Sequence, residues 1–432
     1  MKKMKIALIG FGLEAKSAYD FLRAKFPEAE FDIYDQNEKS KVALPENVIF
    51  FGGVRDFSQI QADLIVRTPA VAPSKLPKNV EITSVTNLFF ENCPAKIIGV
   101  TGTKGKGTTS SLIVSILGAS GKKVHLVGNI GVPALDILPE ISPEDFVVYE
   151  LSSFQLWDAK KSPEIAVVLM IEPDHLDVHA DFAEYLAAKS NIRAFQKDGD
   201  FVVRYPKNEN SKIVAGKKSI EPIFENRDGF FWQKTTDGEQ KICSTSELKL
   251  PGEHNIENAK IAMTAAFLAN PEISNEQFAQ GLNSFTGLPH RLKFVRETHG
   301  VKFYDDSIST TPGSAIAALK SFAEPKILLL GGSNKGADLS PLFAEISASK
   351  TIRKVLVYGV ESSKLTEKFT EINFENFENL GKKPNFEDVV KRAFSVAESG
   401  DVVILSPAHA SFDMFSSYAD RGEQFVRAVE NL

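Results

Sequence analysis

Short apolar, β-branched runs alternate with segments of helical periodicity along the whole chain. This alternation is typical of parallel β-sheets whose strands are joined by crossover helices. The apolar runs predict strands at 5–9, 30–34, 63–66, 96–100, 146–149, 166–170, 326–330, 354–358 and 401–405. They form three groups, so we expect an α/β fold with three domains over residues 1–93, 94–289 and 290–432. The first and third domains are predicted to be Rossmann-like, and the central domain to contain a mostly parallel sheet.

The segment 198–247 departs from this pattern. It is rich in charge and glycine, and it contains alternating residues such as those at 201–203. Alternation with a period of two is typical of strands with one buried face. We therefore predict that this segment forms an antiparallel appendage on the central domain.

The composition excludes several classes of protein. At 432 residues the chain is too long for one ordinary hydrophobic core. A net charge of −6 provides no electrostatic footprint for a polyanion, so we expect no nucleic-acid partner. The longest apolar run, 166–171, is far shorter than the roughly twenty residues of a membrane span. Cys93 and Cys243 have no nearby partner at metal-ligand spacing, and we expect a cytoplasmic protein without a membrane partner.

A glycine-rich segment follows the predicted strand 96–100 and precedes a predicted helix. Glycines let backbone N–H groups approach phosphate oxygens, the helix N-terminus attracts anions, and Lys106 can reach the outer phosphates. The segment predicts a nucleotide triphosphate site in a P-loop-type ATPase domain, with these residues: Gly102, Thr103, Lys104, Gly105, Lys106, Gly107, Thr108 and Thr109. It is not a strict Walker A motif, because five residues separate Gly99 from Gly105 and Gly107 replaces the usual Ser or Thr. A tight surface turn is the alternative.

An acid and an imidazole follow two neighbouring apolar runs. Glu150 comes directly after 146–149, and His175 follows 166–170. Parallel sheets place their ligands at the carboxyl ends of their strands, so we expect both side chains on one rim beside the glycine-rich segment. Triphosphate chemistry needs such groups to hold Mg²⁺. A helix-capping role for Glu150 and a structural role for His175 are the alternatives.

A second glycine pattern lies at the N-terminus. Gly10, Gly12 and Ala15 form a G-x-G-x-x-A fingerprint after the strand 5–9, and Asp35 ends the strand that follows. This arrangement is typical of sites for a dinucleotide pyrophosphate and ribose. Alone, it would indicate a nicotinamide-dependent oxidoreductase, and helix packing alone could also explain the glycines.

The glycine-rich segment resembles the ATP loop of Mur ligases and folylpolyglutamate synthetases, Gly-Thr-Asn-Gly-Lys-Ser/Thr-Thr. The residues 150–156 and 174–177 are similar to a pairing found in Mur ligases, which implies that Glu150 and His175 bind Mg²⁺. Residues 185–189 match the segment whose lysine is carbamylated by CO₂, which implies a carbamylated Lys189 and two magnesium ions. Because Gly107 lacks a hydroxyl, Thr108, Thr109 or a water would have to take its place on the metal.

The resemblance extends to further single residues. Asn129 would contact the muramoyl-peptide or phosphate end of the substrate, and Asn258 would contact the adenine base. Arg291 would reach the ATP phosphates, and Asp306 would hold the ribose. The alternatives are a turn for Asn129, a helix N-cap for Asn258 and an interface salt bridge for Arg291.

The segments 330–338 and 405–425 resemble the glutamate-adding branch of the family. The resemblance implies a glutamate site formed by Thr310, Lys335, Ser411 and Tyr418. In this branch the first domain binds a UDP-sugar, which implies the following contacts: Gly10, Gly12, Leu13, Asp35, Thr68, Pro69 and Asn129. Ala70 and Ile308 depart from the family pattern, where glycine and lysine are usual, and the change at Ile308 leaves the chirality of glutamate open.

Together with these features, the resemblance implies an ATP-dependent amide-bond ligase of peptidoglycan synthesis. It would add glutamate, with the D-enantiomer favoured, to UDP-N-acetylmuramoyl-L-alanine through an acyl phosphate. The predicted catalytic residues are Lys106, Asn129, His175, Lys189 and Arg291. We expect small-molecule partners only and a monomer. The alternatives are an L-glutamate variant, a folate-type ligase, a nicotinamide oxidoreductase and a catalytically silent nucleotide-binding protein.

Overall fold

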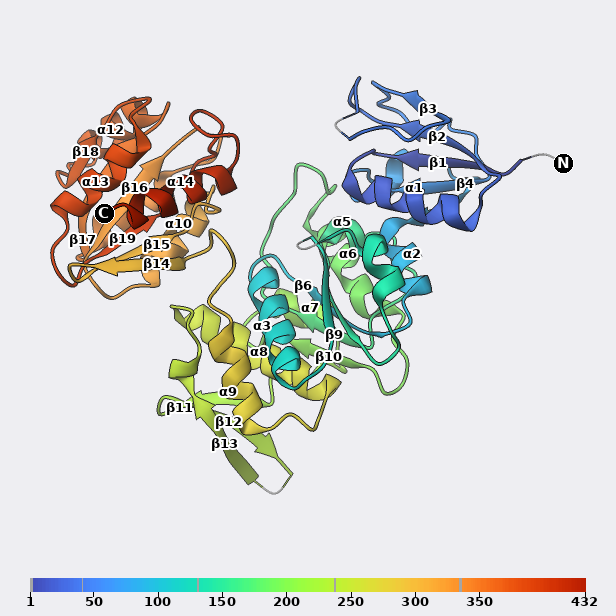
Figure 1. Cartoon of the computed structure of the whole chain (residues 1–432), viewed down its shortest axis with the longest axis horizontal. Helices are drawn as coiled ribbons and strands as arrows, with labels where there is room; N and C mark the ends of the chain where they lie inside the picture. Colours follow the sequence, from blue (N-terminus) through green and yellow to red (C-terminus); the bar gives the residue numbers. More distant parts are fainter. Residues whose placement is uncertain (1–2, 41, 130–131, 237, 334–335) are drawn as a thin grey trace. The chain divides into compact units, whose positions relative to one another are not determined.

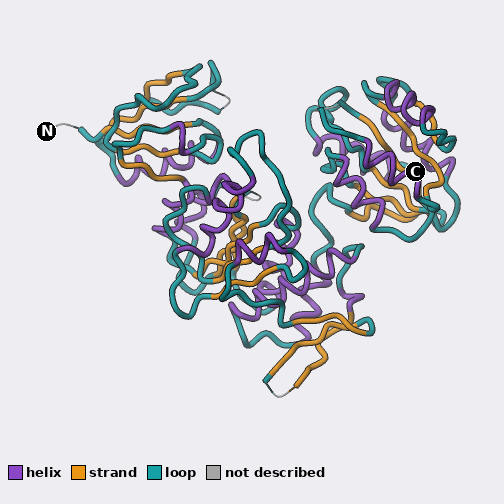
Figure 2. Tube along the Cα trace, turned by 180° about the vertical axis from the view of Figure 1, so that it is seen from behind, coloured by secondary structure: helices purple, strands orange, loops and turns teal. Residues whose placement is uncertain are grey.

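The computed structural model describes residues 3–40, 42–129, 132–236, 238–333 and 336–432 (Figure 1). By its internal contacts the chain divides into two units. The first runs to Leu248 and resumes over Ile256–Phe285, and the second comprises Lys249–Asn255 and Thr286–Leu432. Among the described residues, the first unit holds two parallel sheets and a small antiparallel sheet, and the second holds one mixed sheet, so the structure is of the predicted α/β class (Figure 2). In the described part of the chain, no helix is long and apolar enough to cross a membrane.

The N-terminal sheet has the strand order β3-β2-β1-β4-β5, and its paired strands are parallel. Its elements are β1 (Lys5–Ile9), α1 (Leu13–Lys25), β2 (Glu30–Tyr34), β3 (Val48–Phe51), β4 (Leu64–Arg67), a 3₁₀ turn (Pro73–Lys75), β5 (Glu81–Ser84) and α2 (Val85–Asn92). The central strands β1 and β4 are the most fully buried strands of this sheet, as expected for central strands of a parallel sheet whose faces are covered. Their carboxyl ends carry the Gly10 turn and the loop that begins at Thr68.

The second sheet of the first unit has the order β10-β9-β6-β8-β7, again with parallel pairs. Its strands are β6 (Lys96–Thr101), β7 (Val124–Gly128), β8 (Phe146–Glu150), β9 (Ile165–Val168) and β10 (Phe201–Arg204). Its helices are α3 (Lys106–Ala119), α4 (Ala134–Ile137), α5 (Ser153–Leu156), α6 (Phe182–Ala194), α7 (Glu209–Ala215), α8 (Glu253–Ala269) and α9 (Asn275–Ser284), with 3₁₀ turns at Leu138–Glu140 and Thr245–Glu247. The central strand β6 leads directly into the glycine-rich loop.

The predicted antiparallel appendage is confirmed in part. β11 (Phe224–Arg227), β12 (Phe230–Thr235) and β13 (Gly238–Ser244) form an antiparallel sheet (Figure 2). The assignment of residues 201–203 to it was wrong, because they belong to β10, which pairs in parallel with β9. Val202 and Val203 are both buried, so these residues lack the one-sided exposure that the apparent alternation indicated.

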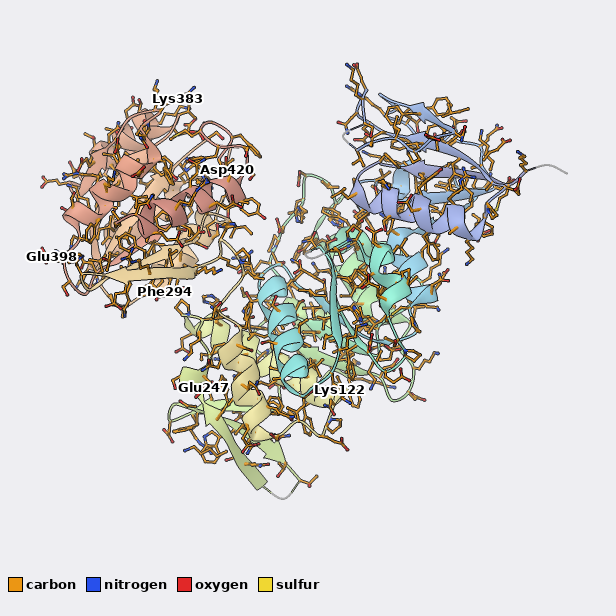
Figure 3. All side chains as sticks on the ribbon, in the orientation of Figure 1. Lys122, Glu247, Phe294, Lys383, Glu398 and Asp420 are labelled. Atoms are coloured by element: carbon orange, nitrogen blue, oxygen red, sulfur yellow. The ribbon has the colours of Figure 1, made fainter. Side chains whose placement is uncertain are left out.

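The second unit contains a sheet of order β14-β15-β19-β16-β17-β18, in which only the β14–β15 pair is antiparallel among the described strands. Its strands are β14 (Lys293–Thr298), β15 (Val301–Asp305), β16 (Lys326–Gly331), β17 (Ile352–Tyr358), β18 (Phe377–Asn379) and β19 (Val402–Leu405). Its helices are α10 (Pro312–Lys320), α11 (Ser340–Ala348), α12 (Ser362–Glu371), α13 (Phe386–Val396) and α14 (Tyr418–Glu430). Apolar side chains of the strands alternate between two cores, one on each face of the sheet. Figure 3 draws the side chains on these elements and labels, among others, Phe294 of β14 and Asp420 of α14.

Candidate active site

The glycine-rich loop connects the end of β6 to the start of α3. Gly105 is in the left-handed region with φ 86°, and a Cβ atom there would lie 2.8 Å from Oδ1 of Asn258. Only glycine fits this turn without strain. Because Gly105 is also the N-cap of α3, the first N–H groups of the helix have no side-chain cap and can bind an anion.

Two loop residues, Thr103 and Lys104, are held by the segment that follows β9. The Thr103 hydroxyl donates to the carbonyl of Glu172 at 3.0 Å and lies 2.8 Å from the hydroxyl of Tyr185. Lys104 forms a 2.7 Å ion pair with Glu172. Lys106 curls over the loop and donates to the carbonyls of Gly102 and Thr103 at 3.0 and 3.2 Å. The loop is therefore preformed, with two lysine charges beside it.

The first turn of α3 contains two buried threonines. Thr108 and Thr109 follow Gly107, and Thr109 is completely buried. The Thr109 hydroxyl has no hydrogen-bond partner among the described residues. A buried hydroxyl without a partner is costly, and a ligand oxygen or a metal ion would remove that cost.

Lys189 lies on α6 beneath the same loop. It is 2% exposed, and its Nζ donates to the carbonyl of Gly102 at 3.0 Å and to the hydroxyl of Thr101 at 3.4 Å. Burial lowers the pKa of Lys189 well below its usual value, and the charge of Lys106 lowers it further. Burial therefore makes the neutral amine more accessible at Lys189 than at an exposed lysine.

Glu150, the last residue of β8, is buried within electrostatic reach of this lysine. Its Oε1 accepts a hydrogen bond from Nδ2 of Asn129 at 3.0 Å, and its Oε2 is buried without a partner among the described residues. The negative charge of Glu150 reaches Lys189 and opposes the lowering of that lysine's pKa. An unpaired carboxylate oxygen in this place is suited to a cation. The capping alternative is wrong, because Glu150 ends a strand and is not at a helix terminus.

His175 lies in the loop after β9, as predicted. Its side chain is 48% exposed, its Nε2 lies 3.5 Å from Oδ2 of Asp174, and its ring packs against Phe154 with centroids 4.9 Å apart. Among the residues that the structure describes, no three His, Cys, Asp or Glu side chains converge as a metal-binding group. A metal here would need the mixed set that was predicted: Thr108, Glu150, His175 and Lys189.

His179 is a site residue that the sequence analysis missed. It is buried, its ring stacks on Phe154 with centroids 5.3 Å apart, and its Nε2 lies 3.0 Å from the hydroxyl of Ser153. Burial lowers its pKa, so the neutral ring is favoured. The only hint in the sequence that His179 belongs to the site was its position four residues after His175.

A cavity of about 630 Å³ lies between the carboxyl ends of the N-terminal strands and the α5 segment. All seven residues predicted to contact the UDP-sugar line it: Gly10, Gly12, Leu13, Asp35, Thr68, Pro69 and Asn129. Asp35 is fixed because Oδ2 accepts from the backbone N–H of Phe11 at 2.6 Å. Gly10 has φ 79°, and a Cβ atom there would overlap the hydroxyl of Thr68. Gly10, the first glycine of the fingerprint, therefore serves a close approach of two loops.

Asn258 lies in the second turn of α8 and is buried beside Gly105. The N-cap alternative is wrong, because the helix begins five residues earlier, at Glu253. Its amide thus adjoins the predicted phosphate loop.

Asp306 is buried in the second unit, just after β15. It accepts from the hydroxyl of Ser406 at 2.7 Å and from the backbone N–H of Leu292 at 3.2 Å. Burial raises the pKa of Asp306 to about 6, while the charge of Arg291 acts in the opposite direction. Arg291 itself is exposed. These two predicted ATP contacts therefore lie near each other.

The residues predicted to bind glutamate differ from one another in how exposed their side chains are. Ser411 is buried, Thr310 is half-buried, and Tyr418 is 41% exposed at the start of α14. Arg421, another residue not predicted, is fully buried and donates to the hydroxyl and the carbonyl of Ser307 at 2.9 and 2.8 Å. It fixes the Ser307 turn to α14.

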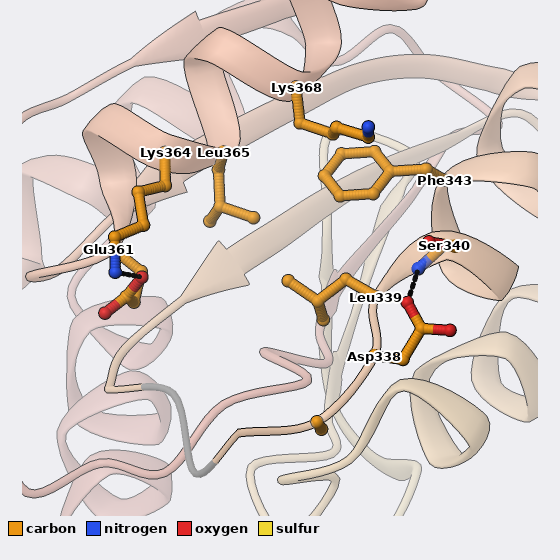
Figure 4. Close-up of a pocket in the computed structure, with 9 residues that line it drawn as sticks. Asp338, Leu339, Ser340, Phe343, Glu361, Lys364, Leu365 and Lys368 are labelled. Carbon is orange, nitrogen blue, oxygen red and sulfur yellow. Dashed lines mark hydrogen bonds and ion pairs between the residues drawn. The ribbon is translucent and has the colours of Figure 1, made fainter.

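Lys335 lies outside the described residues. Two residues after it, Ala337 begins the lining of a hollow of about 230 Å³ between α11 and α12 (Figure 4). Apolar side chains such as Leu339 surround part of it, and a 3.0 Å ion pair between Lys364 and Glu361 lies at its edge.

Comparison with known proteins adds family information to this geometry. Residues 100–266 match the Mur ligase middle domain, and residues 290–409 match the glutamate ligase domain of Mur ligases. The chain is 35% identical over 460 residues to a UDP-N-acetylmuramoylalanine–D-glutamate ligase of Clostridium kluyveri, covering 100% of this chain and 98% of the relative. The enzyme of that name from Clostridium acetobutylicum is also 35% identical, with coverage of 100% and 97%.

Solved structures show the same fold. The UDP-N-acetylmuramate-alanine ligase of Thermotoga maritima aligns with a TM-score of 0.61 at 20% identity, over 99% of each chain. A folylpolyglutamate synthase of the same organism aligns with a TM-score of 0.57 at 14% identity, over 79% of this chain and 91% of that one.

Proposed function

Since the chain belongs to the Mur ligase family, we propose that it joins D-glutamate to UDP-N-acetylmuramoyl-L-alanine with hydrolysis of ATP to ADP and phosphate, as a step of peptidoglycan synthesis. The observation that carries this proposal is the similarity to D-glutamate ligases over the full length of the chain. The folate alternative loses support because the N-terminal cavity gathers every residue predicted to contact a UDP-sugar. The oxidoreductase alternative leaves the β6–α3 loop without a role.

The reaction divides among three domains with the predicted bounds 1–93, 94–289 and 290–432. The first domain binds the UDP part of the acceptor in the cavity above the Gly10 turn. The central domain binds ATP on the loop 102–109, with Asn258 beside the base. Arg291 and Asp306 of the last domain contribute to ATP, and Thr310, Lys335, Ser411 and Tyr418 contribute to glutamate.

Magnesium fits the residues beside the loop. Two buried oxygens, one on the Glu150 carboxylate and one on the Thr109 hydroxyl, have no hydrogen-bond partner among the described residues. Thr108, Glu150, His175 and a carbamylated Lys189 would hold two ions. When bound, Mg²⁺ neutralises charge on the triphosphate and on the transferred phosphoryl group.

Lys189 is suited to carbamylation for a chemical reason. Only a neutral amine attacks CO₂, forming an N–C bond and releasing a proton, and burial favours the neutral amine here. The product replaces a buried amine with a carboxylate-like anion close to Lys106.

The chemistry proceeds in two steps. The alanine carboxylate attacks the γ-phosphorus of ATP, the bond to ADP breaks, and an acyl phosphate forms. The amine of glutamate then attacks the acyl carbon, phosphate leaves, and the amide is complete. Lys106 and the N–H groups of the loop stabilise the transferring phosphoryl group, and positioning of the reactants supplies much of the rate.

The proposal is tested by phosphate release from ATP with UDP-N-acetylmuramoyl-L-alanine and each glutamate enantiomer in turn. We expect release with D-glutamate and at least about 100-fold less with L-glutamate, since enantiomers direct the attacking amine differently. Equal rates, or a preference for L-glutamate, would support the variant ligase. Release with dihydrofolate as acceptor would support the folate-type ligase, and no release with any acceptor would support a silent nucleotide-binding protein.

A further inference from the structure

Arg67, the last residue of β4, directly precedes the cavity-lining residue Thr68, and the proposed function leaves Arg67 without a role. Its side chain is completely buried, although a guanidinium keeps its charge in a protein. A buried charge is tolerated only when it is paired and its donors are satisfied. The hydrogen-bond acceptors of its guanidinium therefore show which segments this residue holds in place.

The guanidinium of Arg67 donates hydrogen bonds to two different segments that line the cavity. Nη1 donates to the carbonyls of Thr68 and Val71, both at 3.2 Å, which belong to the loop after β4. Nη2 donates to the carbonyl of Phe154 at 2.9 Å, on α5 of the central sheet. The loop and Phe154 both line the cavity. One guanidinium thus joins opposite walls.

The carboxylate of Asp158, just after α5, completes the set. Nε of Arg67 donates to its Oδ2 at 2.7 Å and Nη2 donates to its Oδ1, which makes a two-pronged ion pair. Asn87 of helix α2 holds the same segment, because its side chain donates to the carbonyl of Asp158 at 2.9 Å and accepts from the N–H of Lys160 at 2.8 Å. The segment after α5 is therefore anchored both to strand β4 and to helix α2.

We propose that Arg67 is a positioning residue for the UDP-sugar, which sets the separation of the Thr68 loop from α5 through its pair with Asp158. The proposal rests on the proposed function, since it assigns the cavity to that substrate. A preformed cavity avoids the entropic cost of ordering two walls when the ligand binds. The proposed ATP site is the β6–α3 loop, which none of the hydrogen bonds of Arg67 given above reaches, so we expect ATP binding not to depend on this pair.

The test compares Arg67→Lys with Arg353→Lys in the full-length chain. The Lys variant keeps the positive charge and loses the two-pronged hydrogen bonding of the guanidinium. Arg353 is a matched control because it forms a similar pair with Asp401 at 2.6 Å in the second unit. For Arg67→Lys we expect KM for UDP-N-acetylmuramoyl-L-alanine to rise about tenfold, with KM for ATP and kcat within about twofold of wild type. The control should leave all three unchanged.

Asp158→Asn is the second variant, because it keeps the shape of the side chain and leaves Arg67 its three backbone acceptors. It should produce the same selective rise in KM. A lower melting temperature with an unchanged KM for the UDP-sugar would overturn the proposal, as would a parallel loss of kcat and of both KM values. If neither variant folds, the pair serves folding and the positioning role is also overturned. If the wild type itself shows no saturation with the UDP-sugar, the proposed function fails instead.

Discussion

Lys189 combines burial with a hydrogen bond to the backbone of the phosphate loop, and it has no carboxylate within ion-pair distance among the described residues. A lysine in a merely structural role would gain from such a partner, whereas a lysine that must be neutral to react would not. The sequence alone could not indicate this, because position 189 lies on an ordinary helix of mixed polarity.

Replacing Lys189 by Ala is therefore expected to lower kcat at least about 100-fold, since a ligand-organising anion is lost. Acetate or formate should restore part of the activity, because either small carboxylate can place its oxygens in the vacated space. The measurement is phosphate release with and without added carboxylate. Lys212→Ala on α7, where the lysine is exposed, is the control and should behave as wild type in both conditions. A Lys189→Ala enzyme with full activity and no response to carboxylate would contradict the carbamate.

Asp306 predicts a pH dependence. Its pKa of about 6 means that the carboxylate, which can accept hydrogen bonds from ribose hydroxyls, is lost as the pH falls through 6. KM for ATP should rise severalfold between pH 7 and pH 5.5, while KM for the UDP-sugar stays constant. A carboxyl whose pKa is raised by folding stabilises the native state below that pKa, so titration of this group does not unfold the protein in that range.

The matched variant is Asp306→Asn, which should have a higher KM for ATP at pH 7.5 and no inflection near pH 6. If the variant kept the wild-type inflection, another group would be responsible for it.

At the scale of elements, the β6–α3 connection contains Gly107 at the position where the resembling ATP loops carry the hydroxyl of a Ser or Thr. Gly107 lies in the first turn of α3, and glycine there also weakens the helix by about 0.5–1 kcal/mol relative to alanine. Gly107→Ser should lower the Mg²⁺ concentration for half-maximal activity by about fivefold, which corresponds to roughly 1 kcal/mol for one added ligand contact.

Gly118→Ser is the control, since Gly118 lies in the same helix with no atom within 4 Å of an added Cβ. Both substitutions should stabilise α3, and only the first should change the Mg²⁺ requirement. An unchanged requirement in Gly107→Ser would mean that Thr108 or Thr109 already supplies the hydroxyl.

The elements that could be predicted from sequence are those with buried apolar runs. β1, β6, β8, β16 and β19 are central strands with apolar cores, and each was predicted within one or two residues. β3, β5 and β7 were missed because they carry few buried residues in a row. β10 was assigned to the wrong sheet because pairing partners leave little trace in a short strand.

The site divides in the same way. The loop 102–109 and the Gly10 turn are local patterns, and the structure places each at a strand–helix connection, as predicted. The roles of Arg67 and Arg421 were not predicted, because each arginine bonds to a partner about ninety or more residues away in the sequence. Such partners are visible only after the chain has folded.

At the scale of the molecule, the proposed reaction draws its residues from both units. The first unit carries the glycine-rich loop, Glu150, Lys189 and the cavity proposed for the UDP-sugar, whereas the second carries Asp306 and the proposed glutamate residues. The proposed reaction requires that a carboxylate be phosphorylated before the amide forms, since glutamate cannot displace an unactivated carboxylate oxygen at a useful rate.

Oxygen transfer tests this claim most directly. The acceptor is prepared with ¹⁸O in the alanine carboxylate and incubated with ATP, Mg²⁺ and D-glutamate, and the released phosphate is examined by mass spectrometry. The account predicts one ¹⁸O atom in each phosphate, because that oxygen leaves the acyl carbon with the phosphoryl group. Unlabelled phosphate would contradict it, since ATP would then be cleaved without activating the acceptor.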